Sequence, residues 1–308
     1  MLRGGRSSEH EVSLDSARSV VAGLDPDRYE VTTIEIPREG PWLLAEDAAA
    51  GLDVVFPVLH GPFGEDGAVQ GLLELAGVAY VGAGVTASAL AMDKDLFKSV
   101  MRDKGVPVAR SVTLRSVDEV ENPLGFPCVV KPARLGSSVG ISIVRSEAEL
   151  GAAVELAFAH DEKILVEEFL DGVEVECSVL GNADPIASVP GEIVPLASDW
   201  YDYEAKYAEG GMELIVPPRV AAESVARVQE LAVAAFVASD CEGMARVDCF
   251  VRPGGEVVVN ELNTIPGFTA TSVYAKLFEA SGIPYPELLD RLVELALERR
   301  DRRARLRY

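Results

Sequence analysis

The residues with the clearest chemical potential are two carboxylates and an amide near a predicted β-hairpin. Two strand-like runs are joined by a Pro-Gly-Gly turn sequence, and Asp248, Glu261 and Asn263 lie on the runs or just beyond them. Alternation along a strand places Arg246 and Asp248 on one face of the first run. It also places Glu261 and Asn263 on one face of the second run. The two acids and the amide oxygen can therefore converge.

Oxygen ligands of this kind favour Mg²⁺ that is shared with the phosphates of a substrate. Zinc is a poorer match, because no set of nitrogen or sulfur ligands is apparent and the four cysteines show no CxxC pair. We interpret the cysteines as reduced core residues. The alternative for the acids is cross-strand charge pairing with Arg246, although several acids here share one nearby cation.

A segment rich in glycine and serine predicts a phosphate-binding loop. Residues 131–140 have the sequence KPARLGSSVG, and Lys131 ends the preceding strand-like run. Backbone N–H groups in such a loop can cover phosphates while the lysine supplies charge. The segment is not a P-loop, which requires GxxxxGK[ST] at the start of a helix. The alternative is a plain hairpin loop, which would leave the lysine at the strand end without an anion.

Two further segments combine glycines with ionisable side chains. Residues 60–67, with the sequence HGPFGEDG, follow an apolar run, at the position where α/β proteins usually bind ligands. Near the N-terminus, Gly4-Gly5 precede a helix-like stretch in which Glu11 could hold an ammonium group. The structural alternatives are a core role for His60, a helix cap at Glu65-Asp66, and a capping box formed by Ser8 and Glu11.

The segment 200–207, with the sequence WYDYEAKY, is aromatic and charged without clear periodicity, which is typical of a long ordered loop. Such loops often act as lids over active sites, and Lys206 could reach a terminal phosphate. The alternative is a surface loop whose aromatic side chains have no role.

The elements that must position these residues alternate between strands and helices, which predicts an α/β protein with α+β lobes. Strands are expected at 29–36, 53–59, 127–132, 141–144, 164–169, 173–180, 245–251 and 256–260, and helices at 65–76, 146–158 and 221–239. The block from 127 to 180 predicts one small α+β lobe. Only three residues precede Gly4, so the strand that normally leads into such a turn is expected to be missing, and we hypothesise a start several codons upstream.

Length and charge limit the classes of function. A chain of 308 residues can form two or three subdomains that share one cleft. The net charge of −22 disfavours nucleic acid and anionic membranes as partners. No apolar run approaches the ~18 to 20 residues of a membrane helix, and no signal-peptide pattern is apparent, so a cytoplasmic protein is expected.

Taken together, in this order and spacing, these segments resemble the D-alanine-D-alanine ligase family. The similarity rests on EHEVS at 9–13, HGPFGEDG at 60–67, KPARLGSSVG at 131–140, YDYEAKY at 201–207 and NELNTIPGFT at 260–269. It implies an ATP-grasp fold of three subdomains. These would be an N-terminal open parallel-sheet lobe over 1–83, and central and C-terminal lobes over 84–170 and 171–308 that sandwich ATP.

The resemblance also implies roles for individual residues. Those implied for ATP are Lys94, Lys131 and Ser138 near the phosphates, Glu167, Phe169 and Leu170 near adenine, and Glu174 at the ribose. Those implied for two Mg²⁺ ions, which Mn²⁺ can replace, are Asp248, Glu261 and Asn263. Those implied in catalysis are Glu11, His60, Ser137, Lys206, Tyr207, Arg246, Gly267 and Ser272.

The implied reaction joins two D-alanine molecules, for peptidoglycan precursor synthesis, in two steps. The carboxylate of the first, whose ammonium Glu11 would hold, attacks the γ-phosphoryl group of ATP, and Arg246 offsets the negative charge. The amine of the second, whose carboxylate Ser272 would receive, attacks the acyl phosphate. Arg246 and the N–H of Gly267 would stabilise the oxyanion. The lid would be linked to the first lobe through Glu11 and Ser137.

Two departures and two alternatives bear on this expectation. After Ser272 the chain continues Val273-Tyr274-Ala275, where the family usually has a larger aliphatic residue and a proline, and this puts the second-substrate site in question. The missing first strand does the same for the first site. One alternative is a ligase whose product ends in D-serine or D-lactate, although lactate-forming relatives usually lack Tyr207. The other is a catalytically dead nucleotide-binding protein. Family analogy suggests a homodimer.

Overall fold

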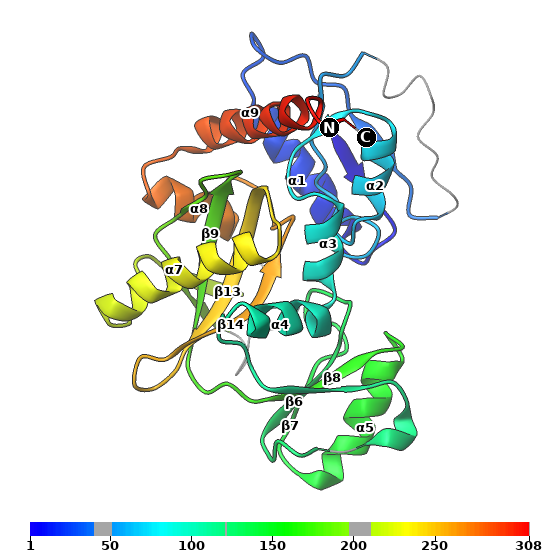
Figure 1. The fold of residues 1–308 in the computed structure, drawn as a ribbon, viewed down its shortest axis with the longest axis vertical. Coiled ribbons are helices and arrows are strands. Elements are labelled where there is room, and N and C mark those ends of the chain that lie inside the picture. The colour runs from blue at the N-terminus through cyan, green and yellow to red at the C-terminus, as the bar shows by residue number, and fades with distance from the viewer. Residues whose placement is uncertain (40–50, 121, 197–210, 308) are drawn as a thin grey trace.

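The computed structural model describes residues 1–39, 51–120, 122–196 and 211–307. An N-terminal group of elements lies beside helix α9 (Tyr285–Arg303), and a large sheet carries helix α7 (Ala222–Ala238) on one face (Figure 1). A smaller sheet with helix α5 (Glu147–Phe158) forms the opposite end of the molecule. Among the helices of these residues, none combines the length and apolar character needed to span a bilayer.

The N-terminal lobe consists of short strands and helices. Along the chain these are β1 (Leu2–Gly4), α1 (His10–Gly23), β2 (Ile34–Ile36), β3 (Val54–Val55), α2 (Ala68–Leu75) and β4 (Ala79–Tyr80). β1 runs parallel to β2, β3 runs parallel to β4, and a parallel bridge joins Leu2 to Pro57. Parallel pairing in this lobe is confirmed, although β2 and β3 are shorter than the predicted strands.

The first strand, which was expected to be missing, is present. The backbone N–H of Leu2 donates to the carbonyl of Phe56 at 2.9 Å, and the carbonyl of Leu2 accepts from Val58 at 3.0 Å. Three residues suffice because the strand ends in a tight turn at Gly4, whose φ is +89°. A Cβ at Gly4 would lie 2.4 Å from the carbonyl oxygen of Ile36, so only glycine fits. The prediction of a missing strand was wrong.

The central lobe is an antiparallel sheet with the strand order β5–β8–β6–β7. Its elements are β5 (Ser111–Leu114), the 3₁₀ turn η1 (Val117–Glu119), β6 (Cys128–Pro132), β7 (Ser142–Val144), α5 and β8 (Ile164–Glu168). Leu150 and Val154 of α5 share a buried core with Val130 and Val166 of the sheet. β5 was not predicted. The run at 173–180, which the local pattern grouped with this lobe, pairs in the other sheet, where the 171–308 range implied by the family resemblance had placed it.

The C-terminal lobe is an antiparallel sheet with the order β12–β11–β9–β13–β14, in which β10 also pairs with β9. Its strands are β9 (Val173–Gly181), β10 (Ile186–Ala187), β11 (Gly191–Pro195), β12 (Met212–Ile215), β13 (Gly243–Val251) and β14 (Val257–Asn263). β9 pairs with β13 along its whole length, and β13 pairs with β14. The predicted hairpin and the predicted helix at 221–239 are confirmed.

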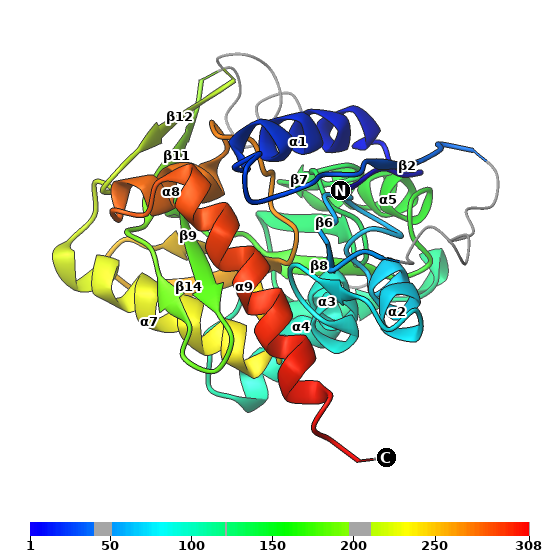
Figure 2. The same cartoon turned by 90° about the horizontal axis from the view of Figure 1, so that it is seen from above.

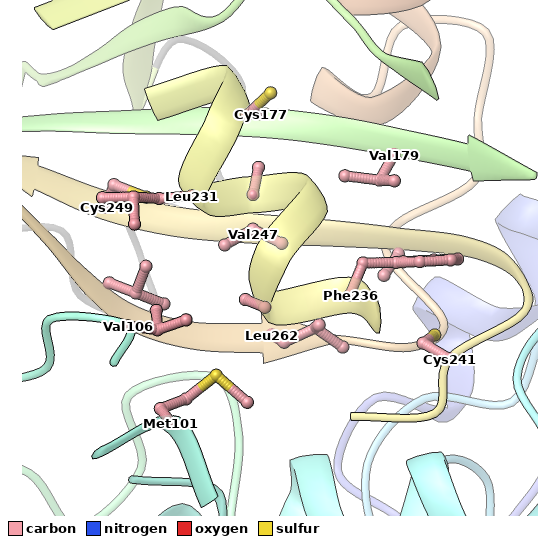
Figure 3. Packing of buried hydrophobic residues seen from close by; sticks show 14 of the residues in the cluster. Met101, Val106, Cys177, Val179, Leu231, Phe236, Cys241, Val247, Cys249 and Leu262 are labelled. Carbon is pink, nitrogen blue, oxygen red and sulfur yellow. The ribbon is translucent and has the colours of Figure 1, made fainter. Parts of the chain in front are cut away.

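Helix α7 covers one face of this sheet, as Figure 3 shows. Its inward residues recur every three or four positions, and Leu231 and Phe236 pack over Cys177, Val247 and Cys249 of β9 and β13. Burying a side chain of the size of leucine or phenylalanine stabilises the fold by roughly 1.5–3 kcal/mol. The cysteines are free and buried, as predicted.

Two helices that follow the first lobe pack into the same core. They are α3 (Val85–Met92) and α4 (Lys94–Asp103), and Ala87, Phe97 and Met101 belong to the core of the C-terminal sheet. In Figure 1, α4 lies between the large and small sheets, so it can carry side chains to a cleft between them.

The lobe boundaries at 83/84 and 170/171 stay predictions.

Helices α8 (Val273–Ala280) and α9 join the C-terminal lobe to the first lobe (Figure 2). The ring of Phe268 lies 5.6 Å from that of Phe56 and 5.4 Å from that of Tyr274. Arg299 of α9 donates to the carbonyls of Tyr80, at 2.6 Å, and Gly82. The first lobe is therefore held against the C-terminal lobe by an aromatic cluster and a buried cation.

Candidate active site

A cleft of about 500 Å³ lies between the central and C-terminal sheets. One wall is formed by β6, β7, β8 and the loop after β6, and the other by residues of β9, β11, β13 and β14. Ligand pockets for small molecules commonly span roughly 300–1,000 Å³, so the cleft is large enough for a nucleotide.

The predicted phosphate loop borders this cleft. Ser137 and Ser138 line it, and both have left-handed backbone conformations, with φ of 55° and 58°. Such conformations are uncommon for residues other than glycine and concentrate at functional sites. Lys131, at the end of β6, is 4% exposed and also lines the cleft.

A buried carboxylate holds this lysine in place. Glu167 on β8 accepts from Lys131 at 2.9 Å, and its second oxygen lies 3.0 Å from the ammonium of Lys98. Burial opposes ionisation of Glu167, but the two ammonium groups outweigh burial and hold the pKa of this carboxyl below its usual value. Lys98 was not predicted, although helical spacing from Lys94, Phe97 and Met101 places it on the same buried face of α4.

Lys94, at the start of α4, connects the two walls. Its ammonium donates to the carbonyl of Leu135 in the phosphate loop at 2.9 Å and lies 3.3 Å from Glu261 on β14. Both predicted lysines therefore meet the predicted acid in the same cleft.

The predicted acidic cluster forms on the hairpin. Strand pairing sets Asp248 opposite Glu261 and Arg246 opposite Asn263. Arg246 donates to both oxygens of Asp248 at 2.7 Å, and the amide of Asn263 donates to Asp248 at 3.0 Å. The charge pairing considered as an alternative is thus present together with the clustered oxygens. Glu176 of β9, which was not predicted, is also 3.0 Å from Arg246.

This donor set fits a hard divalent cation. Asp248 is 2% exposed, and buried carboxylates need a cation partner. Within the described residues, no group of three histidine, cysteine, aspartate or glutamate side chains is placed to hold a metal ion. The cluster here instead combines two carboxylates with an amide oxygen, a set that suits Mg²⁺ bound jointly with phosphate.

The N-terminal lobe reaches the cleft through Glu9 and not through Glu11. Glu9 is buried and accepts a hydrogen bond from Ser137 at 2.6 Å. Glu11 is exposed and pairs with Arg38 at 2.9 Å, so the predicted link between Glu11 and Ser137 was wrong. The capping box is also absent from α1, because Glu9 is the N-cap residue and makes no side-chain cap.

His60 links the first lobe to the loop after β14. Its Nδ1 lies 3.0 Å from the carbonyl oxygen of Ile265, and its Nε2 lies 3.1 Å from the hydroxyl of Ser16. Because a carbonyl only accepts, the neutral ring carries its proton on Nδ1. Burial lowers the pKa of His60, and the ring is therefore neutral near pH 7. The core role considered for this histidine fits these contacts.

Glu65 holds the same loop from the other side. Its carboxylate accepts from the N–H of Gly61 at 2.8 Å and from that of Ile265 at 3.4 Å. Loss of solvation of the carboxylate within the protein, and then the negative charge of Glu9, raise the pKa of Glu65 to about 8.

Gly267 and Ser272 lie together beyond β14. A Cβ at Gly267 would be 3.3 Å from the hydroxyl of Ser272, which accepts from the N–H of Thr269 at 3.0 Å. Tyr274 is fully buried: its ring packs against Phe268 of this loop, and its hydroxyl donates to the carbonyl of Val179 at 3.0 Å. The unusual tyrosine is thus a core residue.

The remaining predicted residues divide between the cleft and the undescribed segment. Phe169, Leu170 and Glu174 line the cleft, where Glu192 and Arg219 face them from β11 and the segment before α7. That second pair was not predicted. Lys206 and Tyr207 lie outside the described residues.

Family models match most of the chain. The model described as "D-ala D-ala ligase C-terminus" matches residues 100–294, and the one described as "D-ala D-ala ligase N-terminus" matches residues 1–52 and 45–83. A D-alanine–D-alanine ligase of Solibacter usitatus is 50% identical, over 97% of this chain and 95% of that relative. D-alanine–D-alanine ligase A of Escherichia coli is 43% identical, over 96% and 94%.

Solved structures give the same result. The VanG D-Ala:D-Ser ligase of Enterococcus faecalis aligns with a TM-score of 0.87 at 38% identity, over 96% of this chain and 98% of that one. The D-alanine–D-alanine ligase of Bacillus anthracis, solved in complex with ATP, aligns with a TM-score of 0.82 at 30% identity, over 98% of each chain. With both lobes of the cleft matched in sequence and in fold, this chain belongs to the D-alanine–D-alanine ligase family.

Proposed function

We propose that this protein joins two molecules of D-alanine with ATP and Mg²⁺, giving D-alanyl-D-alanine, ADP and phosphate. The observation that carries the proposal is the convergence of Lys94, Lys131 and Glu261 in one cleft that the first lobe reaches through the contact of Glu9 with Ser137. The dipeptide would serve peptidoglycan precursor synthesis in the cytoplasm.

The nucleotide is proposed to lie between the two sheets. Lys131 and Lys94 would bind the phosphates together with the backbone of the loop at Ser138, because buried ammonium groups next to free space attract anions. Phe169 and Leu170, which also line the cleft, would supply apolar surface for adenine, Glu167 would contact adenine as well, and Glu174 would supply a carboxylate for a ribose hydroxyl.

Asp248, Glu261 and Asn263 are the proposed ligands of two Mg²⁺ ions, with Mn²⁺ as a substitute. These ions would neutralise charge on the transferring phosphoryl group. In the structure Arg246 pairs with Asp248, and Lys94 pairs with Glu261.

In the first step a carboxylate oxygen of the first D-alanine attacks the γ-phosphorus of ATP, and the bond to the bridging oxygen of ADP breaks. Glu9, in place of Glu11, would bind the ammonium group of this substrate, because Glu9 is the acid that meets the phosphate loop. Arg246 offsets negative charge near the phosphoryl group. The product is an acyl phosphate.

In the second step the neutral amine of the second D-alanine attacks the acyl carbon, and phosphate leaves. The hydroxyl of Ser272 would bind the carboxylate of this substrate, and the N–H of Gly267 beside it would donate to the oxyanion together with Arg246. His60 would act by holding the loop that carries Gly267, through its contact with Ile265. Lys206 and Tyr207 are proposed to close over the acyl phosphate and exclude water.

The proposal is tested by incubating the purified protein with ATP, Mg²⁺ and, separately, D-alanine, L-alanine, D-serine or D-lactate. We expect phosphate release with D-alanine and a dipeptide of matching mass, in equal amounts. A mixed product from D-alanine with D-serine or D-lactate, exceeding the D-alanine dipeptide, would change the assignment of the second substrate. ADP release that ignores every amino acid would refute ligation. A homodimer, also proposed, would be checked by light scattering.

A further inference from the structure

Lys98 is a buried lysine next to the cleft that has no part in the reaction as proposed. It lies on the inward face of α4, and its side chain is 0% exposed. Its ammonium lies 3.0 Å from Glu167 and donates to the backbone carbonyl of Asn260 at 3.3 Å. Lys98 does not line the cleft itself, so any effect on a ligand must pass through its neighbours.

Lys98, Lys131 and Glu167 form a trio of charged side chains with an excess of positive charge. Glu167 is shared by two ammonium groups, Lys131 at 2.9 Å and Lys98 at 3.0 Å, which leaves the trio with one net positive charge. Lys94 and Glu261, 3.3 Å apart, form the adjacent pair, which is neutral. Without Lys98 the pair of Lys131 and Glu167 would be neutral as well. This part of the cleft would then present little net positive charge to a phosphate.

Stability alone does not account for Lys98. Burial lowers its pKa, and so does the charge of Lys131, while Glu167 and Glu261 act in the opposite direction. Replacing a buried ion pair by well-packed apolar residues is often neutral or stabilising. The flanking inward residues of α4, Phe97 and Met101, are apolar, so an apolar side chain would suit this helix face.

We propose that Lys98 is a positioning residue for the nucleotide: it neutralises Glu167 so that the charge of Lys131 acts on the phosphates. The inference depends on the function proposed above, because the contact of Lys131 with phosphate belongs to that function. It adds a residue that does not touch the ligand and acts through the carboxylate of Glu167, which it shares with Lys131.

The test measures binding of Mg²⁺-ADP to the full chain by titration calorimetry. Lys98→Met should weaken binding about tenfold or more, the loss expected when a charged partner of phosphate is neutralised. Lys163→Met is the matched control, because Lys163 is 4% exposed and pairs with Asp93 at 2.6 Å but does not line the cleft. It should change binding less than about threefold.

A double variant separates positioning from a purely structural role. Lys98→Met combined with Glu167→Gln removes the carboxylate too, and so returns the charge of Lys131 to the cleft. We expect it to bind ADP about threefold or more tightly than Lys98→Met alone. If Lys98→Met does not fold, Lys98→Gln gives the same comparison and keeps a donor for Asn260.

The outcomes distinguish this inference from the proposed function. A double variant that binds no more tightly than the single variant, or a control as weak as Lys98→Met, would overturn the positioning role. Unchanged binding in Lys98→Met would do the same. A wild-type chain that does not bind Mg²⁺-ADP would instead refute the proposed function.

Discussion

The two sides of the cleft arrange their buried charged side chains in opposite ratios. On the central-lobe side, Lys98 and Lys131 share the single carboxylate of Glu167. On the C-terminal sheet the ratio is reversed, because Arg246 contacts both Asp248 and Glu176. One set therefore has two cations around one carboxylate, and the other has two carboxylates around one cation.

The difference shows how the two sides of one cleft can serve the two parts of a metal–nucleotide complex. Each set pairs its charges internally, which reduces the cost of burying them. The set with two cations suits phosphate, and the carboxylates of the other set suit a divalent cation. Lys94 and Glu261, which are 3.3 Å apart, connect the two sides of the cleft.

The largest effect is expected from neutralising the acidic wall. Asp248→Asn keeps the size of the side chain but removes the charge that would hold Mg²⁺, so the turnover number should fall by on the order of a thousandfold. Measuring it against Mg²⁺ concentration should show partial recovery at high Mg²⁺. Glu256→Gln, on the same hairpin but 62% exposed, is the control and should behave as wild type. Equal losses in both variants would remove the distinction between the walls.

A smaller effect is expected from the positive wall. Lys131→Met should weaken ADP binding by about a hundredfold, because it removes a buried charge and leaves Glu167 with only Lys98. Calorimetry without added Mg²⁺ tests this wall separately from the other. A variant that binds ADP normally but turns over slowly would place the contribution of Lys131 in the transition state and not in nucleotide binding.

The contact between the first lobe and the cleft should contribute less again. Glu9→Gln should lower kcat/KM for D-alanine about tenfold, because the amide keeps a hydrogen bond to Ser137 but loses the charge for an ammonium group. Glu11→Gln, at a site 71% exposed, should leave kcat/KM unchanged. The reverse result would restore the assignment made from the sequence.

The hairpin and its acids could be predicted because they depend on local rules. Turn residues fix the hairpin, and residues two apart on a strand share a face, which brings Asp248 and Asn263 together. The membership of β9 could not be predicted in this way. Its partner β13 is distant in the chain, and the sequence of an apolar strand does not indicate which other strand it pairs with.

The choice between Glu9 and Glu11 shows a second limit. Residues two positions apart on a helix, such as 9 and 11, point in directions that differ by about 200°. Which of the two faces the protein therefore depends on where the helix begins. The helix begins at His10, which turns Glu11 outward and leaves Glu9 at the N-cap beside the loop. Helix starts are among the least certain features of a sequence. Lys98 was missed for another reason, since lysine is seldom buried.

The smallest effect concerns Glu65, a residue of the first lobe that contacts the loop after β14 at Ile265. Its pKa in the folded protein is raised from 4.5 to about 8. Below the lower value the group is protonated in both the folded and unfolded states and contributes no pH dependence. As the pH rises toward 8, the unfolded state ionises first, so folding becomes progressively less favourable, and above 8 the loss is constant.

Glu65→Gln removes this titration, so its stability relative to wild type should increase between pH 5 and pH 8.5 by about 1 kcal/mol. The expected change is kept small because Glu65 retains some contact with solvent, which screens it. The amide cannot accept from both Gly61 and Ile265, so a constant loss at all pH values is also expected. Urea unfolding at both pH values separates the two effects, since only their difference reports the titration. A difference of zero would mean that Glu65 is ionised at both pH values in the folded protein, which would contradict its raised pKa.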